Sequence, residues 1–164
     1  SAELLPDSTE VEQAKGGPMS LLIEWSNQLA INHEIIDEQH QEMIAMINRL
    51  HDCITEPAQR SQFSGQLEQL CNYTMGHFAT EERLMQQLEY PHLARHQAQH
   101  ALLSQQAYEL NQKFRGGELP LDTAITETLR EWLLNHIQGE DRDLGLFLLQ
   151  RLTANEKKSD AKDR

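Results

Sequence analysis

Residues 63–88 read FSGQLEQLCNYTMGHFATEERLMQQL and form the clearest helical pattern in the chain. Positions that recur at alternating steps of four and three residues lie on one face of an α-helix, and here they do so for about seven turns. The recurring residues are Phe63, Leu67, Leu70, Thr74, His77, Glu81, Leu84 and Leu88. The stretch predicts a long amphipathic helix that ends at Tyr90, with Pro91 in the first turn of the next helix.

Three further stripes of the same period flank this helix. They span residues 36–54, 93–114 and, beginning near Asp122, 122–152. Pro57 follows the first stripe, and two glycines follow the second. Because short connections can join only neighbouring helix ends, the sequence predicts an all-α fold, an antiparallel up-and-down four-helix bundle.

The length and composition of the chain leave room for one domain. Its 164 residues carry a formal net charge of −12 and are 38% hydrophobic. Residues 1–18, rich in Gly, Pro and charge, are expected to be a flexible arm, a linker or an expression leftover. We expect residues 19–153 to form the bundle, with the irregular apolar segment 19–35 packed on it as an N-terminal arm. Residues 154–164 are expected to be a polar tail.

Several classes of partner and location are disfavoured by the same composition. A strongly acidic chain gains nothing from the phosphates of nucleic acid or from anionic membrane surfaces. The sequence has neither an apolar run of the roughly 18 residues needed for a membrane span nor a signal-peptide pattern at its start. We therefore expect a soluble, cytoplasmic protein without membrane insertion. Cys53 and Cys71 lack metal or disulfide spacing and are expected to be small apolar residues.

Ionisable residues occupy inward positions on all four stripes, where core residues are expected. They are His40, His77, Glu81, His96, His100 and His136. One such histidine is usually a hydrogen-bonded core residue, but five of them on four inward faces call for a common explanation. Burying several imidazoles and a carboxylate without partners costs several kcal/mol, and a metal centre satisfies them together.

The spacing of these residues favours shared ligation. Residues four apart lie on one helix face, so His77 with Glu81, and His96 with His100, can each direct two donor atoms toward one point. On the last helix His136 is followed by two acidic residues, Glu140 and Asp141. Asp141 lies about 140° from His136 on a regular helix, so spacing alone does not select it over Glu140.

The set of donors also discriminates among metals. Five histidines with one or two carboxylates are too many for one ion and lack the cysteines usual in structural zinc sites. They suit two iron-like ions bridged by carboxylate. Ferritin-like di-iron bundles use Glu-x-x-His motifs, and this chain has no inward pair of that kind.

Four motifs resemble, in order and spacing, the ligand motifs of the hemerythrin and bacteriohemerythrin family. They are DEQH at 37–40, HFATE at 77–81, HQAQH at 96–100 and HIQGED at 136–141. Myohemerythrin is itself a standard example of the up-and-down bundle, so the resemblance and the helical pattern are not independent support for that architecture.

The resemblance implies a non-haem di-iron centre. His96, His100 and His136 would hold one iron, and His40 and His77 the other. Glu81 and Asp141 would bridge the two ions together with an oxo or hydroxo group, and the family motif is what selects Asp141 over Glu140. Dioxygen is then expected to bind end-on at the one open position of the second iron, oxidising both Fe(II) ions to Fe(III) reversibly.

An apolar pocket is expected to protect such a centre from water and anions. The candidate pocket residues, all within about a turn of the ligands, are Met43, Phe78, Trp132, Leu133 and Ile137. Neutral imidazoles stabilise Fe(III) less than carboxylates do, which favours reversible binding over cleavage of dioxygen.

Three functions remain open at this point. The first is an oxygen carrier that stores dioxygen or delivers it to oxygen-requiring enzymes. The second is an oxygen- or redox-sensing domain of a larger chemoreceptor or cyclase, acting on an effector domain in cis. The third is a di-iron peroxide or nitric oxide reductase. The first predicts a non-enzymatic protein, and the sequence does not fix its oligomeric state.

Overall fold

The computed structural model describes residues 21–162, and these are helical apart from their connections. The expected flexible arm at residues 1–18 lies outside the described residues. The five α-helices are α1 (Glu34–Thr55), α2 (Phe63–Gln87), α3 (Leu93–Arg115), α4 (Thr123–His136) and α5 (Arg142–Lys162). Short helical turns at Asn27–Leu29, Pro57–Gln62 and Ile137–Asp141 connect or precede them.

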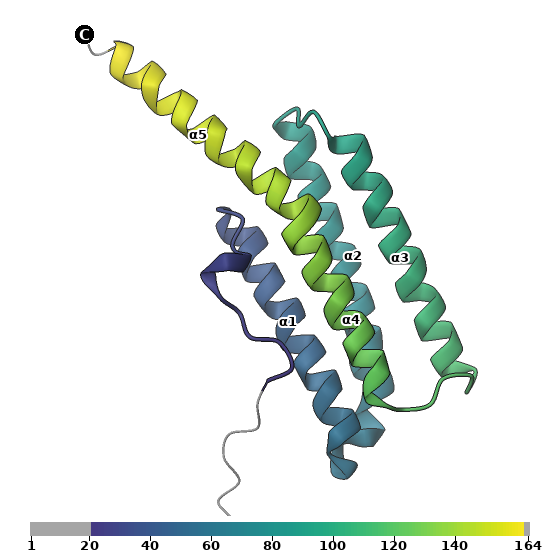
Figure 1. The fold of residues 1–164 in the computed structure, drawn as a ribbon. Coiled ribbons are helices and arrows are strands. Elements are labelled where there is room, and N and C mark those ends of the chain that lie inside the picture. Colours follow the sequence, from purple (N-terminus) through teal and green to yellow (C-terminus); the bar gives the residue numbers. More distant parts are fainter. Residues whose placement is uncertain (1–20, 163–164) are drawn as a thin grey trace, which may run out of the picture.

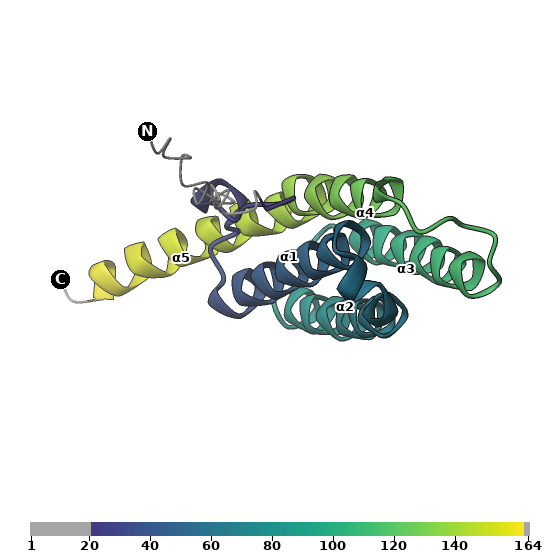
Figure 2. The ribbon, with the colours of Figure 1, turned by 90° about the horizontal axis from the view of Figure 1, so that it is seen from below.

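Helices α1 to α4 form the predicted up-and-down bundle. Consecutive helices run in opposite directions, and α1 packs against both α2 and α4 while α2 also packs against α3 (Figures 1 and 2). The expected all-α four-helix architecture is therefore confirmed. No helix of the described part combines the length and the apolar character that a membrane crossing would need.

The helix ends follow local capping chemistry. The side chain of His33 accepts a hydrogen bond from the amide of Ile36 at the start of α1, and Asp122 accepts one from Ala124 at the start of α4. Helix α3 begins only at Leu93, so Pro91 lies in the preceding turn, and its predicted place in the first turn of α3 was wrong.

The N-terminal arm packs on the bundle through its backbone. Asn48 on α1 receives a hydrogen bond from the amide of Ile23 and donates one to its carbonyl, both at 2.9 Å. Farther along, Ile31 crosses α5 so closely that a β-carbon on Gly145 would lie 2.7 Å from the carbonyl oxygen of Ile31. Only glycine permits this approach.

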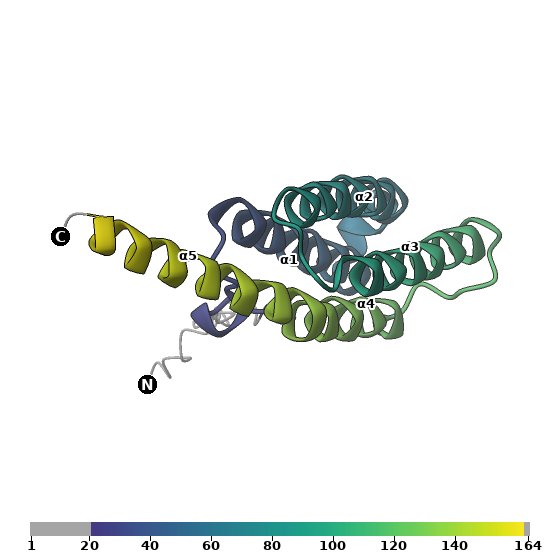
Figure 3. The same ribbon diagram turned by 90° about the horizontal axis from the view of Figure 1, so that it is seen from above.

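The last predicted helix is divided by a single π turn. Residues Ile137–Asp141 adopt π geometry between α4 and α5, with regular helix on both sides. Helix α5 then continues to Lys162 and projects beyond the bundle (Figures 1 and 3). A π turn inserts one residue into an α-helix and frequently marks a functional site.

The core consists of two apolar clusters with a polar layer between them. One cluster includes Met43, Leu70 and Leu133, and the other includes Ile36 and Met85. On α1, α2 and the last helix the inward histidines and carboxylates fall between residues of these two clusters. Each helix therefore contributes polar side chains to one level of an otherwise apolar interior.

Candidate metal centre

Seven ionisable side chains are buried together at this level of the bundle. All have exposed fractions of 0–3%. They are His40 from α1, His77 and Glu81 from α2, His96 and His100 from α3, His136 from α4 and Asp141 from the π turn. The structure thus brings together all the residues that the sequence singled out as metal ligands.

Regular helix geometry positions two of the pairs. His77 and Glu81 stand one turn apart on α2, and the Nε2 atom of His77 lies 2.9 Å from Oε1 of Glu81. His96 and His100 stand one turn apart on α3, with ring centroids 4.5 Å apart. Residues four apart share a helix face, so the two members of each pair point the same way. All four side chains are buried, which shows that this direction is the bundle interior.

The third pair depends on the π turn. His136 and Asp141 are five residues apart, and the extra residue per turn in Ile137–Asp141 brings them into line. Nε2 of His136 lies 3.1 Å from Oδ1 of Asp141. Asp141 is fully buried, whereas Glu140 is only partly buried and faces the other ring nitrogen of His136.

The seven side chains form two overlapping groups. In each group the donor atoms all lie within 4.8 Å of one another, which is close enough to surround one ion. The three-histidine group contains His96, His100 and His136, and the two-histidine group contains His40 and His77. Glu81 and Asp141 belong to both groups.

The unsatisfied atoms at the centre fit metal ions. Both oxygens of Glu81 and of Asp141, and Nε2 of His96, His100 and His136, are buried without a hydrogen-bond partner among the described residues. Some of these atoms are close, as with His96 Nε2 at 3.0 Å from Asp141 Oδ1, but they are not aligned as hydrogen bonds. Buried lone pairs that point at common spaces rather than at each other are costly unless a cation satisfies them.

The protonation chemistry of the metal-free cluster reflects the same crowding. Burial opposes the charged form of His40 and of His96, but the nearby carboxylates of Asp141 and Glu81 outweigh it and raise the pKa of each ring to about 9. Burial also opposes ionisation of the two carboxyl groups. The surrounding histidines, led by His77 for Glu81 and by His136 for Asp141, hold both carboxyl pKa values below their usual range.

Comparison with known families also indicates a cation-binding site. Residues 32–147 match the family described as "Hemerythrin HHE cation binding domain". This chain belongs to the hemerythrin family. The match spans most of the bundle, from just before α1 into α5, and includes all seven residues of the cluster.

Similar hemerythrins cover most of this chain. The bacteriohemerythrin of Stenotrophomonas maltophilia is 36% identical over 76% of this chain and 79% of its own length. That of Methylococcus capsulatus is 34% identical over 77% and 96%. A crystal structure of wild-type hemerythrin matches with a TM-score of 0.71 at 34% identity, covering 76% of this chain and 95% of that one.

Three residues of this hemerythrin contact the outer nitrogens of the clustered histidines and were not predicted in that role. Gln39 Oε1 lies 2.7 Å from Nδ1 of His77, and Glu82 Oε1 lies 2.9 Å from Nδ1 of His100. Glu140 lies 3.6 Å from Nδ1 of His136. The sequence could have indicated the contact between His136 and Glu140, because the two residues are four apart on one helix. The other two contacts join different helices, so their spacing in the sequence does not predict them.

Four of the five expected pocket residues are buried beside the seven clustered side chains, and the fifth, Trp132, is partly exposed. Met43, Phe78, Leu133 and Ile137 are at most 4% exposed. The ring of Phe78 stacks on His100 at 3.9 Å between centroids. Their role in protecting dioxygen stays a prediction.

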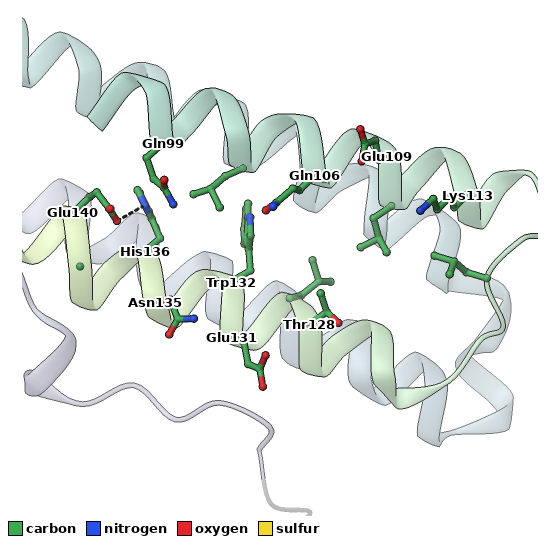
Figure 4. Close-up of a pocket in the computed structure, with 16 residues that line it drawn as sticks. Gln99, Gln106, Glu109, Lys113, Thr128, Glu131, Trp132, Asn135, His136 and Glu140 are labelled. Carbon is green, nitrogen blue, oxygen red and sulfur yellow. Dashed lines mark ion pairs between the residues drawn. The ribbon is translucent and has the colours of Figure 1, made fainter. Parts of the chain in front are cut away.

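Trp132 is half-buried and lines a groove of about 660 Å³ between α3 and α4. Figure 4 shows its ring between the two helices, with His136 and Glu140 at one end of the groove. The groove thus extends from the surface to one edge of the cluster.

The remaining three histidines lie outside the cluster. His33 caps α1, and Nδ1 of His51 lies 3.1 Å from the Thr126 hydroxyl. His92 is exposed just before α3. Cys53 and Cys71 are unpaired, one buried and one half-buried.

Proposed function

We propose that the seven clustered residues hold two iron ions. His96, His100 and His136 would ligate one ion and His40 and His77 the other. Glu81 and Asp141 would bridge them together with an oxo or hydroxo group. The observation that carries this proposal is that both carboxylates belong to both donor groups, because two shared carboxylates are what a bridged pair of ions needs.

The chemistry of the donors favours iron over structural zinc. All seven side chains offer imidazole nitrogen or carboxylate oxygen, whereas structural zinc sites are four-coordinate and usually contain thiolate. Burial raises the pKa values of Cys53 and Cys71, which favours neutral thiols, and neither belongs to the cluster. A nitrogen-rich set with two carboxylates suits two octahedral irons.

Reversible dioxygen binding is the function that this site supports best. When bound, the two irons would supply electrons to dioxygen as it binds and recover them as it leaves. The chain contributes neutral imidazoles, a buried layer between two apolar clusters, and one fewer histidine in the two-histidine group, which leaves room for a ligand there. Similar proteins carry the names bacteriohemerythrin and myohemerythrin, which supports the assignment.

An iron count combined with a spectrum tests this function. The purified protein should contain about two irons per chain, and its reduced form should become coloured in air and bleach again when dioxygen is removed. One iron or a zinc ion per chain would contradict the proposal. Steady consumption of peroxide or nitric oxide with a reductant, without a reversible spectrum, would favour an enzyme instead.

A sensory role is the second candidate, and the π turn favours it. Asp141 is the last residue of that turn, and α5 begins at Arg142, so a rearrangement at the metal site would act directly on the projecting helix. A spin label on α5 should then change its distance to one on α2 when the reduced protein binds dioxygen. An unchanged distance would leave the carrier role.

The proposed metal-binding domain comprises residues 19–153, followed by the polar segment 154–164. The cytoplasmic location expected from the sequence stays a prediction.

A further inference from the structure

The N-terminal arm crosses helix α5 at a single residue, Gly145. A β-carbon at this position would lie 2.7 Å from the carbonyl oxygen of Ile31 and 2.9 Å from its β-carbon, whereas non-bonded carbon atoms pack about 3.5–4.0 Å apart. Three residues earlier on α5, Arg142 donates a hydrogen bond to the carbonyl oxygen of Gln28 at 2.9 Å. The arm is itself held on α1, because Asp37 accepts a hydrogen bond from the Ile31 amide at 2.8 Å. The arm therefore meets α5 at a fixed place.

This crossing accepts only one register of α5. The two neighbours of Gly145 in the sequence are leucines, Leu144 and Leu146. A shift of α5 by one residue in either direction would place a leucine side chain against the Ile31 carbonyl, where even a β-carbon does not fit. The crossing therefore distinguishes Gly145 from both of its neighbours.

The register of α5 decides which acidic residue faces the cluster. In a continuous α-helix, Glu140 would share a face with His136, four residues before it, and Asp141 would point about 100° away. The observed π turn inserts one residue and brings Asp141 inward instead. The two arrangements thus differ by one residue in everything that follows the turn.

The continuous helix would conflict with its surroundings at three places. Each residue of α5 would occupy the place of its successor, so Leu144 would lie at the crossing with the arm. Asp143 would take the buried position of Leu144. Asp141 would replace Arg142 opposite the Gln28 carbonyl, and a carboxylate has no proton to donate there. Two of these three conflicts involve the arm.

We propose that the crossing of Ile31 over Gly145 fixes the register of α5 and thereby selects Asp141, rather than Glu140, as the carboxylate of the last helix that joins the cluster. Ile31 and Gly145 are then positioning residues that act through the helix backbone. The inference rests on the proposed two-iron site, and it does not depend on what the irons bind.

Two single-residue deletions test the register, because each removes the extra residue of the π turn. Deletion of Gly139 leaves Asp141 four residues from His136 and leaves α5 intact, so Asp141 should enter the cluster from a regular helix. Deletion of Asp143 shortens the chain on the other side of Asp141. Because the crossing holds α5 in place, Glu140 should then take the position of Asp141.

Iron content identifies the carboxylate that each deletion variant uses. With Gly139 deleted, D141A should lose iron and E140A should not. With Asp143 deleted the dependence should reverse, so that E140A loses iron and D141A does not. Dependence on Asp141 in both deletion variants would overturn the proposal.

Crystal structures of the metal-free deletion variants separate this inference from the proposed function. A wild-type protein that binds no iron would contradict the two-iron site, but the register would still be visible. Burial of Glu140 in the cluster when Asp143 is deleted would support the inference, and burial of Asp141 there would overturn it.

A substitution at the crossing tests the contribution of the arm without shortening the chain. Gly145→Ala should force the arm and α5 apart, so the Ile31 amide should exchange faster with deuterium and iron should bind roughly tenfold or more weakly. Gly76→Ala is the matched control and should change neither quantity, because Gly76 is next to His77 but has nothing within 4 Å of an added β-carbon. Wild-type iron affinity in Gly145→Ala, with or without faster exchange, would show that the crossing does not position Asp141.

Discussion

The two donor groups of the cluster share their carboxylates but differ in what stands behind their histidines. In the three-histidine group, Nδ1 of His100 is hydrogen-bonded to the anionic side chain of Glu82, whereas Glu140 lies 3.6 Å from Nδ1 of His136 and makes no hydrogen bond to it. In the two-histidine group, the neutral amide of Gln39 faces Nδ1 of His77. An anionic acceptor makes an imidazole a stronger ligand. With the two proposed irons bound, the three-histidine group would therefore hold its ion more firmly and favour its higher charge.

The two-histidine group offers fewer donors. It has one histidine fewer, and its one hydrogen-bonded Nδ1, that of His77, faces a neutral amide rather than an anion. Nδ1 of His40 is buried without a hydrogen-bond partner among the described residues, as are Nδ1 of His96 and of His136 in the other group. With the two proposed irons bound, the smaller number of donors would leave a position for an exogenous ligand at this ion, and the neutral amide would draw the ion less strongly toward oxidation. One metal would then serve as the anchor and the other as the ligand-binding metal.

Removing a shared carboxylate should have the largest effect, because it damages both groups at once. Asp141→Ala removes a donor from each ion and leaves His40, His96 and His136 without their closest carboxylate contact. We expect iron content to fall from about two per chain to well below one. Metal analysis of the purified protein measures this. Glu140→Gln is the matched control and should retain two irons, because Glu140 makes no hydrogen bond to His136. Equal loss in both variants would show that Glu140 also ligates.

Removing a histidine from one group should affect one ion. His77→Ala leaves His40 as the sole histidine of the two-histidine group, so we expect about one iron per chain and loss of the reversible air-dependent spectrum. His77→Gln, which preserves a neutral polar side chain, tests whether bulk alone matters. If both irons were lost, the anchoring group would not be independent, and the division between the two groups would fail.

The regular helices of this site were readable from the sequence, whereas the π turn was not. His77 with Glu81 and His96 with His100 follow the same period as their apolar neighbours, so their inward direction follows from the stripe. Asp141 breaks that period by one residue. The residue inserted by the π turn Ile137–Asp141 aligns Asp141 with His136. The helix propensities of the individual residues do not predict such a turn. Family resemblance, not spacing, selected it over Glu140.

Contacts between helices were also beyond the reach of the sequence. Glu82 follows Glu81 on α2, but its contact with His100 depends on how α2 and α3 are rotated and spaced. The projection of α5 was likewise missed, because its leucines continue the period of α4 until the bundle ends. Periodicity reports which face is apolar and does not report where the partner helices stop.

The metal-free protein should lose stability as pH rises, in both groups alike. The pKa values of His40 and His96 stand at about 9 in the folded chain, against about 6.5 when unfolded. Their stabilising contribution is therefore complete below pH 6.5 and lost as pH approaches 9. We expect each of the two histidines to lower the unfolding free energy of the iron-free protein by about 3 kcal/mol over this interval. The depressed carboxyl pKa values of Glu81 and Asp141 add a second loss in acid, below about pH 4.

Chemical denaturation of iron-free protein at several pH values measures this dependence. The iron-loaded protein should behave differently, because ligation requires neutral imidazoles and iron affinity therefore rises with pH. A flat stability profile for the iron-free protein between pH 6.5 and pH 9 would mean that the histidines are already neutral in the folded cluster.

Exchanging the acceptors behind the histidines should have the smallest effect and addresses the difference between the groups most directly. Glu82→Gln replaces the anion at Nδ1 of His100 by a neutral amide of the same shape, so we expect roughly 10- to 100-fold weaker iron binding in the three-histidine group and a higher reduction potential. Gln39→Glu places an anion behind His77 and should shift the two-histidine group in the opposite direction. Chelator competition and redox titration measure both. If the two variants shifted the potential in the same direction, charge behind the histidines would not be what distinguishes the two metals, and the number of histidines alone would account for the asymmetry.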